Sequence, residues 1–220
     1  FHHDLKRLCE MAHAKGALVY ADIIHAVGST PLDVRESGVD FASASSYKWL
    51  MGEMGLGFMY VRKDRLAEIR RPWFGHNQLA SRRSLGFPAA EPADTVTEYE
   101  HLDSALGYFA MGTQANIVAA QLDYSLEYVL KVGVERIQEY RQPMMDRLRE
   151  ALPKAGYTTI TPPGTRTALI SFRHNRDGEA LYYQLRDAGV TITVGQHHIR
   201  ISPSVFNDMD DVDRVIRALG

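Results

Sequence analysis

The pattern of apolar and polar positions predicts three short strands in the first third of the chain. An apolar run over 17–21 ends at Asp22, and a second run over 39–44 leads into Ser-Ser-Tyr-Lys. A third run covers 58–61. Apolar runs of this length between turn residues are typical of strands. The first run is apolar throughout, so we expect a strand that is covered on both faces.

Apolar residues at helical spacing mark most of the remaining segments. Asp4 and Asp64 stand where they would cap the first two predicted helices. The predicted helices run from Asp4 to about 15, from Asp64 to about 70, from 112–113 past 129, from near 134 to about 155, from about 177 to 188, and from near 208 onward.

Two segments interrupt or follow this pattern. Residues 71–104 contain three prolines and four large aromatic residues but no hydrophobic period, so we expect a long loop, which is usually functional in a compact domain. The C-terminal third reads as a small α+β unit, with a strand over 168–172 and an antiparallel pair over 190–194 and 199–202. Its predicted hinge to the preceding residues is the Pro-Pro-Gly sequence at 162–164.

The composition says more about the expected binding partners than about the fold. Hydrophobic residues make up 45% and charged residues 24% of 220, which is ordinary for a soluble globular protein. The net charge of -2 gives no reason to expect nucleic acid, and no apolar run approaches the roughly 20 residues of a membrane span. The single cysteine, Cys9, excludes an intrachain disulfide and fits a reducing, cytoplasmic location.

Candidate chemistry lies where the first two predicted strands end, as ligand sites do in open α/β sheets. Lys48 follows the second strand, and a lysine amine in a partly desolvated site can form a Schiff base with a carbonyl. Asp22 follows the first strand and could hold a positive charge on a ligand nitrogen. The ordinary interpretations are a surface lysine for Lys48 and a turn former or helix cap for Asp22.

Four further residues are candidates for binding a cofactor or a substrate. His25 could hydrogen-bond an oxygen of either, and the hydroxyls of Ser45 and Tyr47 suit a phosphate. Thr113 follows a glycine just before a predicted helix, a position that favours anions. The ordinary interpretations are a structural histidine, polar strand ends and a helix N-cap.

Arg200 alternates with two isoleucines in the last predicted strand. A guanidinium there can bind a carboxylate through two parallel hydrogen bonds, although an edge-strand charge that faces water is the ordinary interpretation. His197 and His198 are adjacent, so on a strand they point to opposite faces, and we expect no metal site.

Taken together, four motifs in this order resemble the class V aminotransferase family of pyridoxal-phosphate (PLP) enzymes. The motifs are Asp22-x-x-His25, Ser45-Ser46-Tyr47-Lys48, Gly112-Thr113 and Arg200-Ile201-Ser202-Pro203. The resemblance extends over nearly all 220 residues. The family includes cysteine desulfurases, kynureninases and isopenicillin-N-epimerase-like proteins, and Asp-x-x-His with Tyr-Lys is most similar to the last two groups.

The resemblance implies roles for the residues at the strand ends. Lys48 would hold PLP as a Schiff base and shuttle the Cα proton. Asp22 would pair with the pyridinium nitrogen, and His25 would contact the ring hydroxyl or the substrate. Ser45 and Tyr47 would bind the cofactor phosphate.

It also implies roles for two residues farther along the chain. Thr113 would reach the cofactor phosphate of the neighbouring subunit, in a homodimer with a shared active site. Arg200 would bind the α-carboxylate of an amino-acid substrate. No membrane or nucleic-acid partner is expected.

Two features depart from the family pattern. Cysteine desulfurases need a nucleophilic cysteine shortly before the arginine strand, but residues 193–198 contain none, so we do not expect persulfide chemistry. Family members are about twice as long, in line with two-domain chains. Because Phe1 would fall inside their large domain, we expect that an N-terminal portion with the phosphate loop and the ring-stacking residue is missing from this sequence.

The resulting prediction is an α/β fold, the C-terminal part of a fold-type I PLP-dependent transferase. Residues 1–139 would complete a large domain with a mostly parallel sheet, and residues 140–220 would form a small α+β domain. The expected reaction occurs at the Cα of an amino acid and is aminotransferase-like or C–S or C–C lyase-like. Alternatives are an epimerase or racemase of the same family, and a non-catalytic scaffold, which would be colourless and would take up no PLP.

Overall fold

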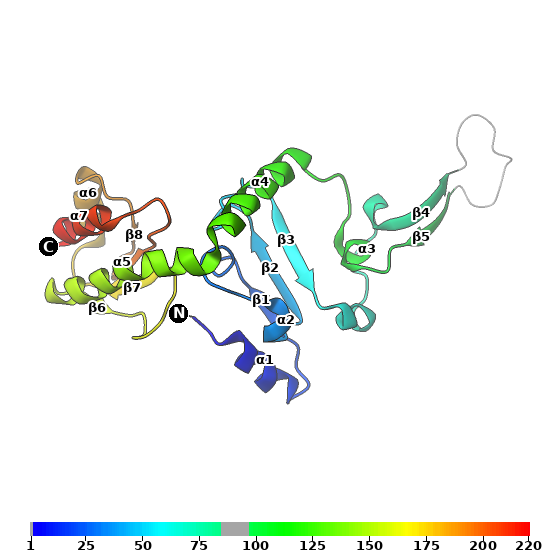
Figure 1. Ribbon diagram of the computed structural model, residues 1–220, viewed down its shortest axis with the longest axis horizontal. Coiled ribbons are helices and arrows are strands. Elements are labelled where there is room, and N and C mark those ends of the chain that lie inside the picture. The colour runs from blue at the N-terminus through cyan, green and yellow to red at the C-terminus, as the bar shows by residue number, and fades with distance from the viewer. Residues whose placement is uncertain (1, 85–96) are drawn as a thin grey trace.

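The structure is a computed structural model that describes residues 2–84 and 97–220 (Figure 1). A central sheet with two short helices stands between a β-hairpin at one end and a C-terminal unit at the other. Two long helices lead from the side of the central sheet into the C-terminal unit. No helix in the described ranges combines the length and the apolar character that a membrane crossing requires.

The elements follow in chain order. The N-terminal part contains α1 (Leu5–His13), β1 (Tyr20–Asp22), α2 (Val34–Ser37), β2 (Phe41–Ser45), β3 (Gly57–Val61) and the 3₁₀ helix η1 (Lys63–Glu68). The middle part contains η2 (His76–Gln78), β4 (Leu79–Ser84), β5 (Thr97–His101), α3 (Ala105–Phe109), α4 (Asn116–Val132) and α5 (Val134–Lys154). The C-terminal part contains β6 (Thr158–Thr159), β7 (Ile170–Arg173), α6 (Gly178–Asp187), β8 (Thr193–Val194), β9 (His198–Ile201) and α7 (Met209–Leu219).

The central sheet has the order β1-β2-β3 and confirms the three predicted strands. β1 is parallel to β2, with Asp22 opposite Ser43, and β2 is antiparallel to β3. Parallel neighbours end at the same edge of a sheet, so Asp22 and Ser45 lie on one edge. This pairing brings the polar residues after both strands together.

The prediction that the first strand is covered on both faces is wrong for this chain. Leu18 is 47% exposed and Tyr20 is 59% exposed. The reason is position, because β2 is the only strand beside β1 in the described sheet. The core of this part is formed instead by five buried residues from α1, from the residue after β1, and from β2 and the segment before it: Cys9, Ile23, Val39, Ala42 and Ala44.

Two caps and one loop were predicted in the N-terminal half, with different outcomes. Asp4 caps α1 through a hydrogen bond from the Arg7 amide, which is confirmed. The prediction for Asp64 is wrong, because it lies inside η1 and its carboxylate accepts instead from the Arg62 guanidinium.

The prediction of a loop over 71–104 is wrong for the residues of β4 and β5, which pair as an antiparallel hairpin. Their sequences are mostly polar, so no apolar period marked them, and backbone pairing formed the strands. Residues 85–96 of that segment lie outside the described residues.

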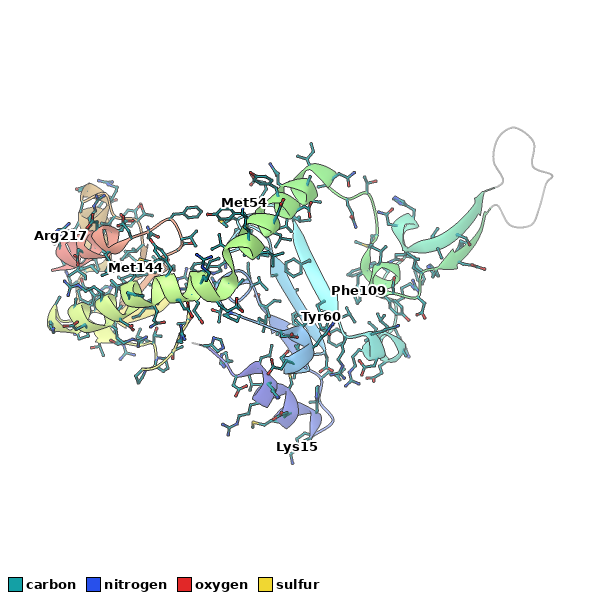
Figure 2. The ribbon with its side chains drawn as sticks, viewed as in Figure 1. Lys15, Met54, Tyr60, Phe109, Met144 and Arg217 are labelled. Carbon is teal, nitrogen blue, oxygen red and sulfur yellow. The ribbon has the colours of Figure 1, made fainter. Side chains whose placement is uncertain are left out.

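The C-terminal unit is a four-stranded sheet of order β6-β7-β9-β8, packed with α5, α6 and α7 around a closed core. Figure 2 shows Met144 on α5 inside this unit and Tyr60 on the central sheet. The predicted antiparallel pair is confirmed as β8 and β9. Pro162–Gly164 is not a hinge to the preceding residues, because β6 before it pairs with β7 after it. The domain division at 139/140 stays a prediction, since α5 runs across it.

Candidate active site

The candidate active site lies at the edge where β1 and β2 end. Asp22 is the last residue of β1, and a turn carries His25 three residues later. Ser45 is the last residue of β2, and the following turn carries Lys48. The structure therefore brings together the acid, the imidazole and the amine that the sequence predicted at separate strand ends.

A direct contact joins the amine to the imidazole. Lys48 Nζ lies 3.0 Å from His25 Nε2. On the other side of the ring, Trp49 Nε1 donates to His25 Nδ1 at 3.3 Å. Both His25 nitrogens are thus engaged by the turn that follows β2.

Gly28 allows the two turns to approach this closely. Its φ of +77° suits glycine, and a Cβ atom at this position would lie 2.7 Å from the Trp49 carbonyl oxygen. Any side chain there would push the His25 turn away from the Lys48–Trp49 backbone. The glycine is therefore needed for the contact between Lys48 and His25.

The environment keeps His25 neutral. Partial burial lowers the pKa of His25, and the positive charges of Lys48 and Arg200 lower it further, while Asp22 acts in the opposite direction. Arg200 therefore acts on His25 through its charge, although it lies on β9 of the C-terminal unit. A neutral imidazole can both accept and donate a hydrogen bond.

Asp22 stands between two open clefts. One of about 690 Å³ is lined by Asp22, Ser45, Phe58 and residues of α3. The other, of about 430 Å³, is lined by Asp22, His25 and, from the C-terminal unit, Leu169. Both volumes fall within the usual range for small-molecule sites. One carboxylate oxygen of Asp22 accepts from the Ile24 amide at 3.0 Å, which orients the side chain.

The Lys48 turn is held in place by Ser46. This side chain is buried, and its hydroxyl contacts the carbonyl oxygens of Glu53 at 2.6 Å and Leu56 at 3.1 Å. Tyr47 is 44% exposed, with the Lys48 amine 6.0 Å from its ring centre. Tyr47 and the strand-end Ser45 are thus neighbours of Lys48 along the turn, and their role in a phosphate site stays a prediction.

Two predicted residues lie outside the turns that follow β1 and β2. Arg200 is exposed on β9 and donates to the Thr193 hydroxyl at 3.2 Å. Thr113 is exposed in the segment before α4, and no hydrogen bond joins it to Asp22 or Lys48 within the part of the chain that the structure describes. Its interpretation as the N-cap of α4 is wrong, because Ala115 is the N-cap.

Two further residues, Trp49 and Arg141, support the site and were not predicted from the sequence. Trp49 follows Lys48 directly in the sequence, and its indole donates to His25 Nδ1. Arg141 on α5 is 2% exposed, and its guanidinium lies 5.6 Å from the centre of the Trp49 ring. A signal existed for Arg141, because it occupies the position between Ile137 and Met145 in the buried stripe of α5.

Comparison with known proteins identifies the family. Residues 2–218 match the family described as Aminotransferase class-V. The chain belongs to this class-V aminotransferase family. The family is one of PLP-dependent enzymes, which agrees with the resemblance of the four motifs.

Class-V aminotransferase relatives match almost the whole chain. An uncharacterized aminotransferase, YcbU, from Bacillus subtilis is 27% identical over 97% of this chain and 54% of its own length. A kynureninase from Myxococcus xanthus is 29% identical over 98% of this chain and 51% of its own length. The chain thus spans about half the length of the curated relatives it matches.

A solved structure supports the same fold. The apo cysteine desulfurase from Thermococcus onnurineus NA1 superposes with a TM-score of 0.84, at 19% identity, over 99% of this chain and 55% of that one. At this identity the likeness shows the fold alone. The predicted α/β fold of a fold-type I PLP-dependent transferase is confirmed.

The side chains at the sheet edge fit PLP in their chemistry. The Lys48 amine suits the cofactor carbonyl, the Asp22 carboxylate suits a protonated ring nitrogen, and the Ser45 and Tyr47 hydroxyls suit part of a phosphate site. The two clefts at Asp22 are open to a ligand of this size. The chemistry of these side chains therefore suits one side of a PLP site.

Proposed function

We propose that the protein is a PLP-dependent enzyme that acts at the Cα of an amino acid through a Schiff base at Lys48. The observation that carries this proposal is the 3.0 Å contact of Lys48 Nζ with neutral His25, at the sheet edge that also carries Asp22. A lysine amine in a partly desolvated site beside a neutral imidazole can act as a nucleophile towards a carbonyl. Aminotransferase-like and C–S or C–C lyase-like reactions both begin in this way.

The cofactor and the protein have separate tasks. PLP, when bound, supplies a carbonyl that condenses with the Lys48 amine and a ring that accepts electron density from the substrate. Asp22 holds the proton on the ring nitrogen, and the Ile24 amide keeps its carboxylate in place. Lys48 takes and returns the proton at the substrate Cα, and His25 binds an oxygen of the ring or the substrate.

Arg200 is proposed to bind the α-carboxylate of the substrate. One of its five N–H donors is used by Thr193, and its exposed guanidinium still influences the pKa of His25. A planar guanidinium binds carboxylates through two parallel hydrogen bonds. Ser45 and Tyr47 are proposed to bind the cofactor phosphate.

The proposed assembly is a cytoplasmic homodimer with shared active sites. Family members of this kind act on amino acids, and Thr113 would bind the cofactor phosphate of the neighbouring subunit. Its exposed position before α4, away from Lys48 of its own chain, is compatible with that role.

Persulfide chemistry is not proposed. Residues 193–198, before and at the start of the Arg200 strand, contain no cysteine, and Cys9 is buried in α1. An epimerase or racemase reaction is the second candidate, because the Asp22-x-x-His25 and Tyr47-Lys48 motifs resemble that branch of the family as well as the kynureninases. Product analysis with a panel of amino acids separates these outcomes.

Lys48→Ala tests the proposal in the full-length protein. The wild type should be yellow as purified, and borohydride should attach the cofactor covalently to the peptide containing Lys48. Lys48→Ala should abolish that attachment and lower turnover by roughly a thousandfold or more. Lys63→Ala, which removes an exposed lysine from η1, is the matched control and should change neither.

Colourless full-length protein that takes up no PLP would refute the enzyme and favour a non-catalytic scaffold. Borohydride attachment at a different lysine would refute the assignment of Lys48 while leaving PLP binding intact.

A further inference from the structure

The indole of Trp49 makes a contact with His25 that the proposed function does not use. Trp49 Nε1 lies 3.3 Å from His25 Nδ1, and Lys48 Nζ lies 3.0 Å from His25 Nε2. These two contacts occupy opposite sides of one imidazole ring. Together they determine where the ring carries its proton.

The indole N–H can only donate a hydrogen bond. His25 Nδ1 must therefore accept, so it carries no proton while the Trp49 contact exists. A neutral imidazole holds one proton, which must then lie on Nε2. That proton points at the Lys48 amine.

The Lys48 amine must accept this proton in a hydrogen bond, which requires a free lone pair. An ammonium group at Lys48 has no lone pair and could only donate to Nε2. Such donation would move the imidazole proton to Nδ1 and break the bond from Trp49. The indole bond and the free amine therefore favour each other.

We propose that Trp49 is a positioning residue that holds His25 in the Nε2–H tautomer, so that His25 donates to Lys48 and favours its neutral, nucleophilic form. The value of that form for catalysis rests on the proposed function of Lys48. The tautomer itself does not, because it can be measured without cofactor.

Arg141 and Ser29 keep the indole and the imidazole in place. The Arg141 guanidinium lies over the Trp49 ring, with 5.6 Å between its central carbon and the ring centre, and donates to the Ser29 carbonyl oxygen at 2.9 Å. The Ser29 hydroxyl donates to the His25 carbonyl oxygen at 2.8 Å. One buried cation on α5 is thus linked to both the donor and the acceptor of the indole bond.

The charges that face His25 agree with a neutral ring. Burial lowers the pKa of His25, the charge of Arg200 lowers it further, and Asp22 acts in the opposite direction. A protonated imidazole would carry hydrogen on both nitrogens and could not accept from Trp49.

The test is ¹⁵N NMR of the histidine rings in the full-length protein after removal of the cofactor, with His25→Gln to assign the His25 signals. The wild type should show His25 with its proton on Nε2. Trp49→Phe should populate the Nδ1–H tautomer, because the competing donor is gone. Trp73→Phe is the matched control: its indole donates at the same distance, 3.3 Å, but to the Phe109 carbonyl oxygen.

A second measurement follows the pH dependence of Lys48 modification by an amine-directed reagent, read by mass spectrometry. Loss of one hydrogen bond should slow Lys48 labelling near neutral pH by about two- to tenfold in Trp49→Phe and leave Trp73→Phe unchanged.

A wild-type His25 with its proton on Nδ1 would overturn the proposal, and this result needs no variant to fold. Unchanged tautomer and labelling in a folded Trp49→Phe would overturn it as well. Failure of the wild type to bind PLP would refute the proposed function and leave the tautomer result intact.

Discussion

The central sheet and the junction with the C-terminal unit each bury one charged side chain, and they compensate it in opposite ways. Asp40, the residue before β2 of the sheet, has a side-chain exposure of 0%. Its carboxylate accepts from the Val19 amide at 2.7 Å, from Arg65 at 2.7 Å and from His13 at 2.8 Å, with Arg62 3.0 Å away. Every side of this carboxylate is therefore occupied by a donor.

Arg141 at the junction has no carboxylate partner among the described residues. One of its terminal nitrogens donates to Ser29, the other is buried without a hydrogen-bond partner, and the Trp49 ring faces the guanidinium. Burial lowers the pKa of Arg141 to about 10. One hydrogen bond and the contact with the Trp49 ring therefore hold the guanidinium, rather than an ion pair among the described residues.

The two buried charges therefore have different roles: one stabilises the fold, and the other positions side chains near the site. A buried charge with a complete set of donors strongly resists removal of one partner, because the rest would be left unpaired. A buried charge with few partners contributes little net stability, since its desolvation is not fully offset. Asp40 therefore stabilises the sheet, while Arg141 orients the Trp49 indole and the His25 imidazole.

The largest expected effect is that of Asp40→Asn. It leaves two arginines without their buried partner, so we expect a loss of about 3 kcal/mol in the free energy of unfolding, measured in urea. Asp64→Asn is the control: that side chain is 61% exposed, and an exposed ion pair such as its pair with Arg62 contributes little to stability, so we expect a much smaller loss. Equal losses in the two variants would contradict the stabilising role of Asp40.

A smaller effect is expected from acid. Burial would raise the pKa of Asp40, but hydrogen bonds from His13, Val19 and Arg65 outweigh it and lower the pKa to about 2. The unfolded value is near 3.9. The Asp40 carboxylate therefore makes its full contribution to the free energy of unfolding above about pH 4. This contribution of about 2 kcal/mol is lost as pH falls towards about 2.

Urea midpoints measured from pH 5 to pH 2 check this expectation. The wild type should lose more stability over this range than Asp40→Asn, which has no titrating carboxylate at that position. Parallel curves for the two proteins would show that Asp40 does not provide the acid sensitivity.

The smallest expected change in stability is that of Arg141→Met. Removing a desolvated charge offsets the loss of one hydrogen bond to Ser29, so the free energy of unfolding should change by no more than about 1 kcal/mol. The His25 tautomer should nevertheless shift towards Nδ1–H, because the indole loses its support. A loss of 3 kcal/mol or more would show that Arg141 is compensated as fully as Asp40.

Much of the site could be predicted from local sequence. Apolar runs located β2 and β3, the capping residue Asp4 located α1, and the sequence pattern predicted α6 and α7, because these signals depend on near neighbours alone. The parallel pairing of β1 with β2 could be expected to bring Asp22 and Lys48 to one edge. The hairpin of β4 and β5 could not be found in this way, because polar strands carry no apolar period.

The sequence by itself therefore determined the family, the acid and amine at the strand ends and most helices. Only the tertiary structure decided which side chains surround the imidazole. Arg141 and Ser29 are 112 residues apart and meet through one hydrogen bond. Such a contact depends on how α5 packs behind the strand ends, and local periodicity records only that a position is buried, not which distant group it meets.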